Sequence, residues 1–92
     1  MTEGESPYSI VWTSPAKRDM ARLPARVIDL VVEFIYGPLI VNPRRLGRAL
    51  RWELEGRYSA HRGQFRVVYR IEETARVVYI ERVGHRADVY RQ

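Results

Sequence analysis

The 92-residue sequence contains no cysteine. This absence excludes disulfide bonds, thiolate nucleophiles and cysteine-ligated zinc within the chain, and it is compatible with the cytoplasm, where we expect the protein. Long apolar runs are also missing. The most hydrophobic stretch, Val27 to Val41, is interrupted by charged side chains and by Gly37-Pro38, so we expect no membrane-spanning helix. The first five residues include two glutamates and no basic residue, and no apolar segment follows them, so we expect no secretory signal either.

Lysine is nearly absent, and yet the chain is basic. Sixteen lysines and arginines outnumber eleven acidic residues, which gives a net charge of +5, and Lys17 is the single lysine. The isoelectric point is near 10.1. Such an excess of cations predicts a polyanionic partner, because cations that neutralise phosphates release the bound counterions. The preference for arginine over lysine is equally well explained by the codons of a GC-rich genome, but that explanation does not account for the net charge.

The length fits one domain, which we place at residues 8–92 after a short tail at residues 1–7. Alternating apolar residues predict a strand from Tyr8 to Trp12. Ser14 and Pro15 then predict the start of a helix, with Ser14 as the N-cap. A second helix is expected after Pro24, and Asn42-Pro43 is expected to end it. Its apolar face consists of Val27, Leu30, Val31, Phe34 and Ile35.

The second half of the chain alternates with period two. After a basic connector at residues 44–50, we expect three strands in hairpin succession, beginning near residues 57, 65 and 77. In the middle strand Phe65, Val67, Tyr69 and Ile71 share one face, and Arg66, Val68 and Arg70 share the other. Helices that precede a run of strands predict an α+β fold, with the two N-terminal helices packed on one face of a mainly antiparallel sheet.

The outward residues of the later strands are notably cationic. Arg62 lies at the turn before the middle strand, Arg66 lies within that strand, and Arg86 and Tyr90 follow the last strand. Convergent guanidinium groups suit phosphate, because each presents a planar fork of donors. We therefore expect a phosphate-binding surface, to which the further arginines Arg44, Arg45, Arg48, Arg51, Arg57 and Arg70 would contribute. The alternative is a solvated strand face on which arginines pair with Glu53, Glu55 or Glu81.

Two stretches resemble the RelE/ParE toxin superfamily. One runs from Leu54 to Ile71 (LEGRYSAHRGQFRVVYRI), with a Leu-x-Gly bend, a glycine turn and an aromatic-Arg-x-x-Tyr strand; the other runs from Val83 to Tyr90 (VGHRADVY). Upstream, residues 16–19 with Leu23-Pro24 and residues 42–50 also match. The resemblance covers nearly the whole chain from Tyr8 onward and is closest to actinobacterial RelE-type toxins.

The resemblance implies a function and a set of catalytic residues. RelE-type toxins enter the ribosomal A site and cut mRNA with its own 2′-OH, without a metal or another cofactor. By position, Arg66 stabilises transition-state charge, Arg86 acts as an acid or a phosphate ligand, and Tyr90 stacks on a base and helps to position the 2′-OH. We add Arg62 as a further cation and His85 as the proton carrier, because histidine titrates near neutral pH.

This sequence departs from the family pattern in the groups that transfer protons. One branch uses two lysines before the turn, where this chain has Arg57 and Ser59. Another branch uses a glutamate, where this chain has a basic residue near Arg48. His61, beside the turn, is a weaker candidate than His85. The charge-stabilising residues are therefore better supported by the sequence than the proton-transfer residues.

The resemblance also implies partners and leaves alternatives. The expected partners are mRNA, the ribosome and a RelB-like antitoxin with an acidic C-terminal segment, in a toxin–antitoxin hetero-oligomer. A second hypothesis is a ParE-type toxin of the same fold that inhibits DNA gyrase without cutting RNA. A third is a degenerate member that only binds its antitoxin or regulates DNA. The presence of Arg66, Arg86 and Tyr90 together favours the nuclease.

Overall fold

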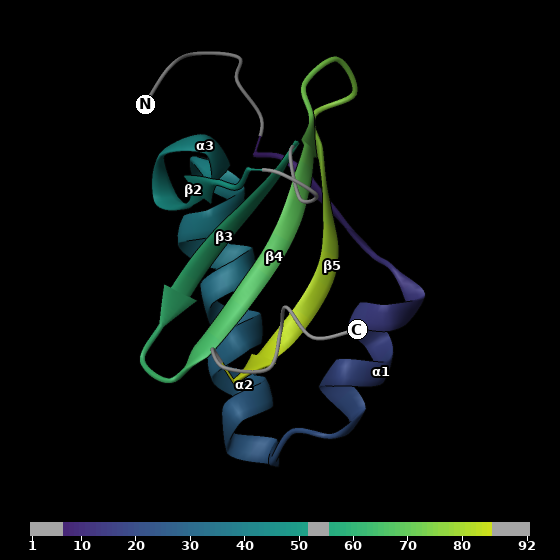
Figure 1. Ribbon diagram of the computed structural model, residues 1–92, viewed down its shortest axis with the longest axis vertical. Coiled ribbons are helices and arrows are strands. Elements are labelled where there is room, and N and C mark those ends of the chain that lie inside the picture. The colour runs from purple at the N-terminus through teal and green to yellow at the C-terminus, as the bar shows by residue number, and fades with distance from the viewer. Residues whose placement is uncertain (1–6, 52–55, 86–92) are drawn as a thin grey trace.

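A computed structural model describes residues 7–51 and 56–85. The elements in chain order are β1 (Ser9–Trp12), α1 (Ser14–Ala21), α2 (Ala25–Phe34), the π-helical turn η1 (Ile35–Leu39), α3 (Pro43–Leu46), β2 (Arg48–Ala49), β3 (Arg57–Arg62), β4 (Phe65–Glu72) and β5 (Val77–His85). Within these residues five strands form one sheet in the order β1-β5-β4-β3-β2 (Figure 1). β1 runs parallel to β5, and the other neighbours are antiparallel. The α+β prediction with a mainly antiparallel sheet is confirmed.

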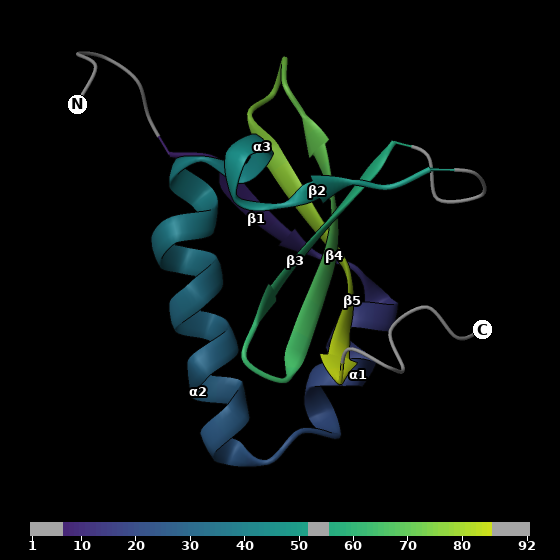
Figure 2. The ribbon, with the colours of Figure 1, turned by 60° about the vertical axis from the view of Figure 1, so that its left-hand side comes forward.

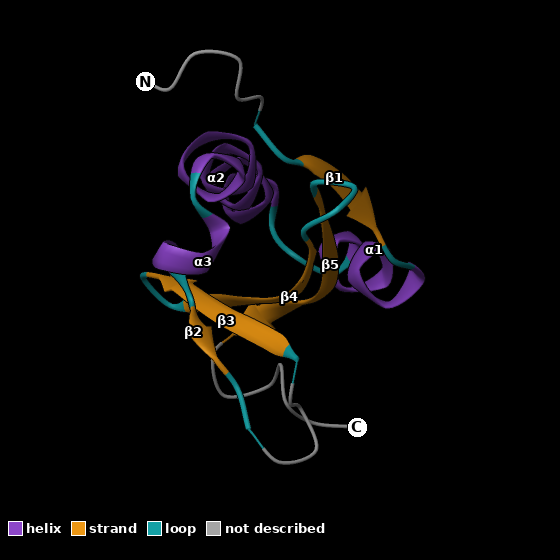
Figure 3. Ribbon diagram, turned by 90° about the horizontal axis from the view of Figure 1, so that it is seen from above, coloured by secondary structure: helices purple, strands orange, loops and turns teal. Residues whose placement is uncertain are grey.

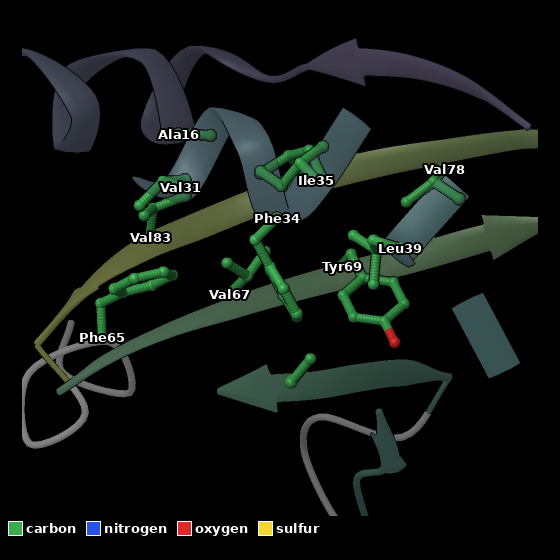
Figure 4. Close-up of a cluster of buried hydrophobic side chains, with 12 residues drawn as sticks. Ala16, Val31, Phe34, Ile35, Leu39, Phe65, Val67, Tyr69, Val78 and Val83 are labelled. Atoms are coloured by element: carbon green, nitrogen blue, oxygen red, sulfur yellow. The ribbon is translucent and has the colours of Figure 1, made fainter. Parts of the chain in front are cut away.

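The core lies between α2 and the sheet. Figures 2 and 3 show α2 running along one side of the curved sheet, across from β3 and β4. Val31 and Phe34 from α2 meet the predicted inward residues of β4, of which Phe65, Val67 and Tyr69 are buried (Figure 4). The predicted apolar face of this helix is wrong at Leu30, which is 50% exposed because it lies at the flank of the buried stripe. We call the sheet surface that α2 covers the inner face, and the opposite surface the outer face.

The N-cap of the first helix lies one residue before the predicted one. Thr13 is the N-cap, and its hydroxyl oxygen accepts from the Ala16 N–H at 3.4 Å and donates to the Ile80 carbonyl at 2.7 Å. Thr13 keeps the extended backbone of the strand before it, whereas Ser14 is already helical. The prediction of Ser14 as the cap is therefore wrong, because the hydroxyl one residue earlier serves both the helix and the sheet.

α1 lies beside the second half of β5, beyond the end of β1. Its buried Asp19 accepts from the Val83 backbone N–H at 2.9 Å and from the Arg82 guanidinium at 2.8 and 3.3 Å. The hydrogen bond that Arg82 donates to Asp19 raises the pKa of Arg82 above its ordinary value. A carboxylate thus satisfies a backbone donor of β5 where no strand pairs with it.

The segment predicted as a basic connector contains two short elements. The helix after Pro24 continues through the turn at Gly37 and Pro38 and ends before Asn42, as predicted. Pro43 then opens α3, and β2 adds two residues to the edge of the sheet beside β3. The sequence did not indicate these elements within the connector, because a strand of two residues is too short to leave a periodic signal.

Candidate nucleic-acid interface

The turn at Gly63 and Gln64 sets which side chains share the outer face. Arg62 pairs with Phe65 across this two-residue loop, and Gly63 has the positive φ of +60° that such a turn requires. Counting back from the loop, His61 lies opposite Arg66, and Ser59 lies opposite Val68. Directly opposed residues project to the same face, and Phe65 and Val67 occupy the core, so Ser59, His61 and Arg66 belong to the outer face.

A cleft on the outer face contains Arg66. This Arg66 cleft has a volume of about 460 Å³ and is lined by Leu46, Arg48, Ala49, Leu50, Ser59, Ala60, His61 and Arg66. Arg66 donates from Nη1 to the Ser59 hydroxyl at 3.3 Å, and Arg48 is the register partner of Ser59. The described lining includes two arginines and no carboxylate. Its chemistry suits an anion with several acceptor oxygens, such as a phosphodiester.

Buried contacts fix the wall of the cleft that α3 and β2 form. The Tyr69 hydroxyl, buried in the core, donates to the Pro43 carbonyl at 2.5 Å. Burial raises the pKa of Tyr69 far above its ordinary value, so the hydroxyl remains a neutral donor. Gly47 passes so close that a Cβ there would lie 2.2 Å from the Tyr69 oxygen and 3.0 Å from the Ser59 carbonyl oxygen. The absence of a side chain at Gly47 therefore lets the backbone between α3 and β2 pass close to the Tyr69 hydroxyl.

Arg57 and Arg70 share one carboxylate on the same face. Glu81 accepts from Arg57 Nε at 2.7 Å and from Arg70 Nε at 3.2 Å, at the irregularity where β5 has one more residue than β4. The Arg70 guanidinium also lies 4.2 Å from the centre of the Tyr79 ring. The alternative of arginine–glutamate pairs thus describes these two arginines. Both stay partly exposed, at 34% and 43%, so each can still present donors to solvent.

Arg44 belongs to a separate group of side chains, the Glu73 cluster, formed by Tyr8, Arg44, Tyr58, Glu73 and Arg76. Glu73 accepts from the Tyr8 hydroxyl at 2.8 Å and from Arg44 Nε, and Arg44 also donates to the Tyr58 hydroxyl at 2.7 Å. Arg76 lies over the Tyr8 ring. The hydrogen bonds from Tyr8 and then Arg44 hold the pKa of Glu73 below its ordinary value. The guanidinium of Arg44 is therefore already matched by a carboxylate.

Two predicted catalytic residues lie apart from Arg66. Arg62 and His85 are both register partners of Phe65, whose side chain is in the core, so they project toward the inner face at the end of the sheet. Arg62 accordingly lies 5.3 Å from the centre of the Phe34 ring of α2. Both residues are exposed. The structure thus brings Arg48 and Arg66 together in the cleft, whereas Arg62 and His85 project toward the inner face at the end of the sheet.

The remaining predicted site residues are either exposed or outside the described part of the chain. Arg45 in α3 and Arg51 after β2 are exposed. Arg86 and Tyr90 lie outside the described residues, as do Glu53 and Glu55. Within residues 7–51 and 56–85, no helix is both long and apolar enough to cross a membrane, and no cluster of three or more histidine and carboxylate side chains could hold a metal ion.

The sequence placed His61 below His85 as a candidate, and His61 is the histidine that the structure places in the cleft. It lines the cleft and lies opposite Arg66. The signal for it was present in the sequence, because a two-residue turn at Gly63 and Gln64 determines every cross-strand pair of the hairpin. Without that register, a histidine beside a turn is indistinguishable from any exposed histidine.

Comparisons with a family model and with known sequences indicate the same family of toxins. A family model described as the ParE toxin of the type II toxin–antitoxin system ParDE matches residues 10–90. Toxin RelG of Mycobacterium tuberculosis is 48% identical over 86 residues, covering 94% of this chain and 99% of the relative. Toxin RelE of the same organism is 45% identical over 87 residues, covering 95% of this chain and 90% of the relative.

Solved structures agree with the fold. A chain of the toxin–antitoxin complex RelBE2 from Mycobacterium tuberculosis is 46% identical with a TM-score of 0.84, covering 88% of this chain and 100% of that chain. A chain of the intact Escherichia coli RelBE complex has a TM-score of 0.72 at 20% identity, covering 85% and 95%. At that identity the second likeness concerns the fold alone.

Proposed function

The chain belongs to the ParE toxin family of type II toxin–antitoxin systems, within its RelE-type members, and from this membership we propose that it is a ribosome-dependent endoribonuclease that cuts mRNA in the A site. The identities of 45% and 48% to toxins named RelE and RelG support this branch over the gyrase-directed one. Action on ribosomes would place the protein in the cytoplasm.

The observation that carries the proposal is the Arg66 cleft. It joins Arg48 and Arg66 around an open volume on the outer face, with no carboxylate in its described lining to neutralise them. A phosphodiester that enters the cleft can therefore accept hydrogen bonds from both arginines. This arrangement favours RNA over an apolar ligand.

The chemistry is an in-line displacement within the message. The 2′-oxygen attacks the adjacent phosphorus, the bond from phosphorus to the 5′-oxygen breaks, and the products are a 2′,3′-cyclic phosphate and a 5′-hydroxyl. Negative charge grows on the phosphoryl oxygens during the attack, and Arg66 is the cation that stabilises it. By the resemblance, Arg86 assists at the phosphate or the leaving oxygen and Tyr90 positions the base. Arg62 and His85 would act from the end of the sheet.

Arg57 and Arg70 extend the proposed RNA-binding surface beyond the cleft. They lie opposite each other, four residues along β4 from Arg66, or about 13 Å at the rise of a strand. Their exposed donors can bind a neighbouring phosphate of the message while Glu81 keeps them in place. Arg45 and Arg51 add charge nearby, and Arg44 contributes least because Glu73 already binds it.

A cognate antitoxin is the proposed regulator. The printed description of the RelBE2 structure is a toxin–antitoxin complex, and its toxin-like chain matches this one at 46% identity. We expect a RelB-like protein whose acidic C-terminal segment covers the cationic outer face and forms a hetero-oligomer with the toxin. Charge complementarity of this kind makes association fast and sensitive to salt.

The proposal is tested by adding the purified protein to an in vitro translation reaction and mapping the 5′ ends of the mRNA. Cuts in phase with codons are expected, with 5′-hydroxyl ends that a kinase labels without prior phosphatase treatment. Arg66→Ala should reduce cleavage about 10²–10³-fold, the usual cost of removing one donor to transition-state charge.

Arg26→Ala provides the matched control, because Arg26 is an exposed arginine on α2 and takes no part in the cleft. It should cut like the unmodified protein. If the message stays intact while DNA supercoiling by gyrase is inhibited, the nuclease proposal is wrong and the ParE-type alternative replaces it.

A further inference from the structure

We propose that His61 is the general base of the reaction, a role that rests on the proposed nuclease function. It would take the proton from the attacking 2′-hydroxyl. The sequence had favoured His85 for proton transfer, and the structure points to the other histidine.

The position of His61 on the sheet carries the inference. His61 is the register partner of Arg66, so their Cβ atoms lie about 4.5–5.5 Å apart on the same face. Both side chains line the Arg66 cleft. A phosphate bound by Arg66 therefore has the imidazole at its side, within reach of the ribose that carries the 2′-hydroxyl. His85 faces the other way, because its partner is the core residue Phe65.

The composition of the cleft leaves His61 as the group with the right chemistry. The charged side chains that line the cleft with it are Arg48 from β2 and Arg66 from β4, and both are cations. Arginine does not release its proton in proteins, and a serine hydroxyl such as that of Ser59 is a weak base. Imidazole is the side chain that changes its protonation near neutral pH. Among the described lining residues, His61 alone can accept a proton there.

Every proton in the proposed step has a donor and an acceptor. The imidazole accepts the 2′-hydroxyl proton while the 2′-oxygen forms its bond to phosphorus. The bond to the 5′-oxygen breaks, and that oxygen takes a proton from solvent. The imidazolium then returns its proton to solvent, so His61 ends the cycle neutral. Arg66 stays charged throughout and binds the phosphoryl oxygens.

The test is a pH–rate profile of ribosome-dependent cleavage, measured at saturating programmed ribosomes, for the unmodified protein and for His61→Ala. A general base works only when it is neutral, so the rate for the unmodified protein should fall on the acid side of neutrality. His61→Ala should lose about 10²–10⁴-fold in kcat, the usual contribution of such a base, with KM little changed. The acid limb of its profile should disappear.

Free imidazole supplies a readout that a merely structural role would not move. His61→Ala leaves a space beside Arg66, and added imidazole should restore cleavage in a saturable way. Gln64→Ala is the control, because Gln64 is an exposed residue of the adjacent turn and its variant should cut normally with and without imidazole.

The outcomes separate this inference from the proposed function. Cleavage by His61→Ala at the normal rate and with the acid limb intact would overturn the inference and leave the nuclease function standing. Loss of the acid limb in His85→Ala, with its retention in His61→Ala, would transfer the role to His85. If the unmodified protein does not cut mRNA on ribosomes at all, the proposed function fails first.

Discussion

Two groups of arginines on this small domain have opposite surroundings. In the Glu73 cluster, Arg44 binds a carboxylate and a tyrosine hydroxyl. In the Arg66 cleft, Arg48 and Arg66 line an open volume whose described lining has no carboxylate. The side chains have the same formal charge in both places, but a carboxylate lies against Arg44 and none is among the described lining residues of the cleft. We infer that the distribution of the acidic residues, more than that of the arginines, decides where an anion binds.

The difference also separates function from stability. A carboxylate that binds an arginine within the fold holds elements together, as Glu81 does for β3, β4 and β5. The Arg66 cleft has no such carboxylate in its described lining, so changing its surroundings should affect RNA cleavage more than folding.

The largest effect is expected when a carboxylate is placed in the cleft. Ser59→Asp would set an acidic group against Arg66, where the serine hydroxyl now accepts at 3.3 Å, and so make the cleft resemble the Glu73 cluster. Cleavage should fall about 10²–10³-fold, because the charge of Arg66 is neutralised before substrate binds. Ser59→Asn has nearly the same volume without the charge and should retain far more activity. Equal losses in the two variants would refute the role of charge.

The second effect concerns Asp19, the buried carboxylate at the edge of β5. Asp19→Ala leaves the Val83 N–H and the Arg82 guanidinium without this acceptor, so we expect a loss of about 2–3 kcal/mol in the free energy of unfolding. That corresponds to a fall of roughly 10–20 °C in the midpoint of thermal unfolding. Asp19→Asn should lose less, because its amide oxygen can still accept from Val83. A midpoint unchanged in Asp19→Ala would contradict the role of this carboxylate.

A smaller effect is expected at the wall of the cleft. Tyr69→Phe removes the donor to the Pro43 carbonyl and should cost about 1–2 kcal/mol, measured by urea denaturation. Because this bond holds α3 near the sheet, KM for programmed ribosomes should rise as well. Tyr36→Phe is the comparison, because it removes a half-exposed hydroxyl that accepts from the Trp12 indole and does not line the cleft, and it should leave KM unchanged. A KM unchanged in Tyr69→Phe would show that the wall is held by other contacts.

The smallest effect is expected in the Glu73 cluster, and it depends on pH. The pKa of Glu73 is lowered in the folded protein, so its stabilising contribution is present above the unfolded value near 4.5 and is lost as the pH falls through the folded pKa. Glu73→Gln should therefore unfold at a slightly lower temperature than the unmodified protein at pH 7, and at the same temperature in strong acid. Cleavage should be unaffected. A stability difference that persists in acid would mean that hydrogen bonding, and not charge, stabilises the cluster.

Much of the fold could be predicted from the sequence because its signals are local. Alternation placed Phe65, Val67 and Tyr69 in the core, and the glycine turn placed the hairpin of β3 and β4. The parallel pairing of β1 with β5 could not be predicted from either segment, because residues near 10 and near 78 meet only in the folded chain. The capping role of Thr13 was missed for the same reason, since its hydroxyl also bonds to Ile80.

For the site, the sequence by itself determined that the chain is cationic and that Arg66 points away from the core side of its strand. It also showed that two stretches, Leu54 to Ile71 and Val83 to Tyr90, resemble a toxin family. Only the tertiary structure decided which of the described arginines have a carboxylate beside them. It paired Arg44 with Glu73 and Arg57 with Glu81, it turned His85 away from Arg66, and it placed His61 beside Arg66. The physical reason is that residue type fixes the charge of a side chain, whereas its electrostatic environment depends on neighbours that the folded chain brings from distant parts of the sequence.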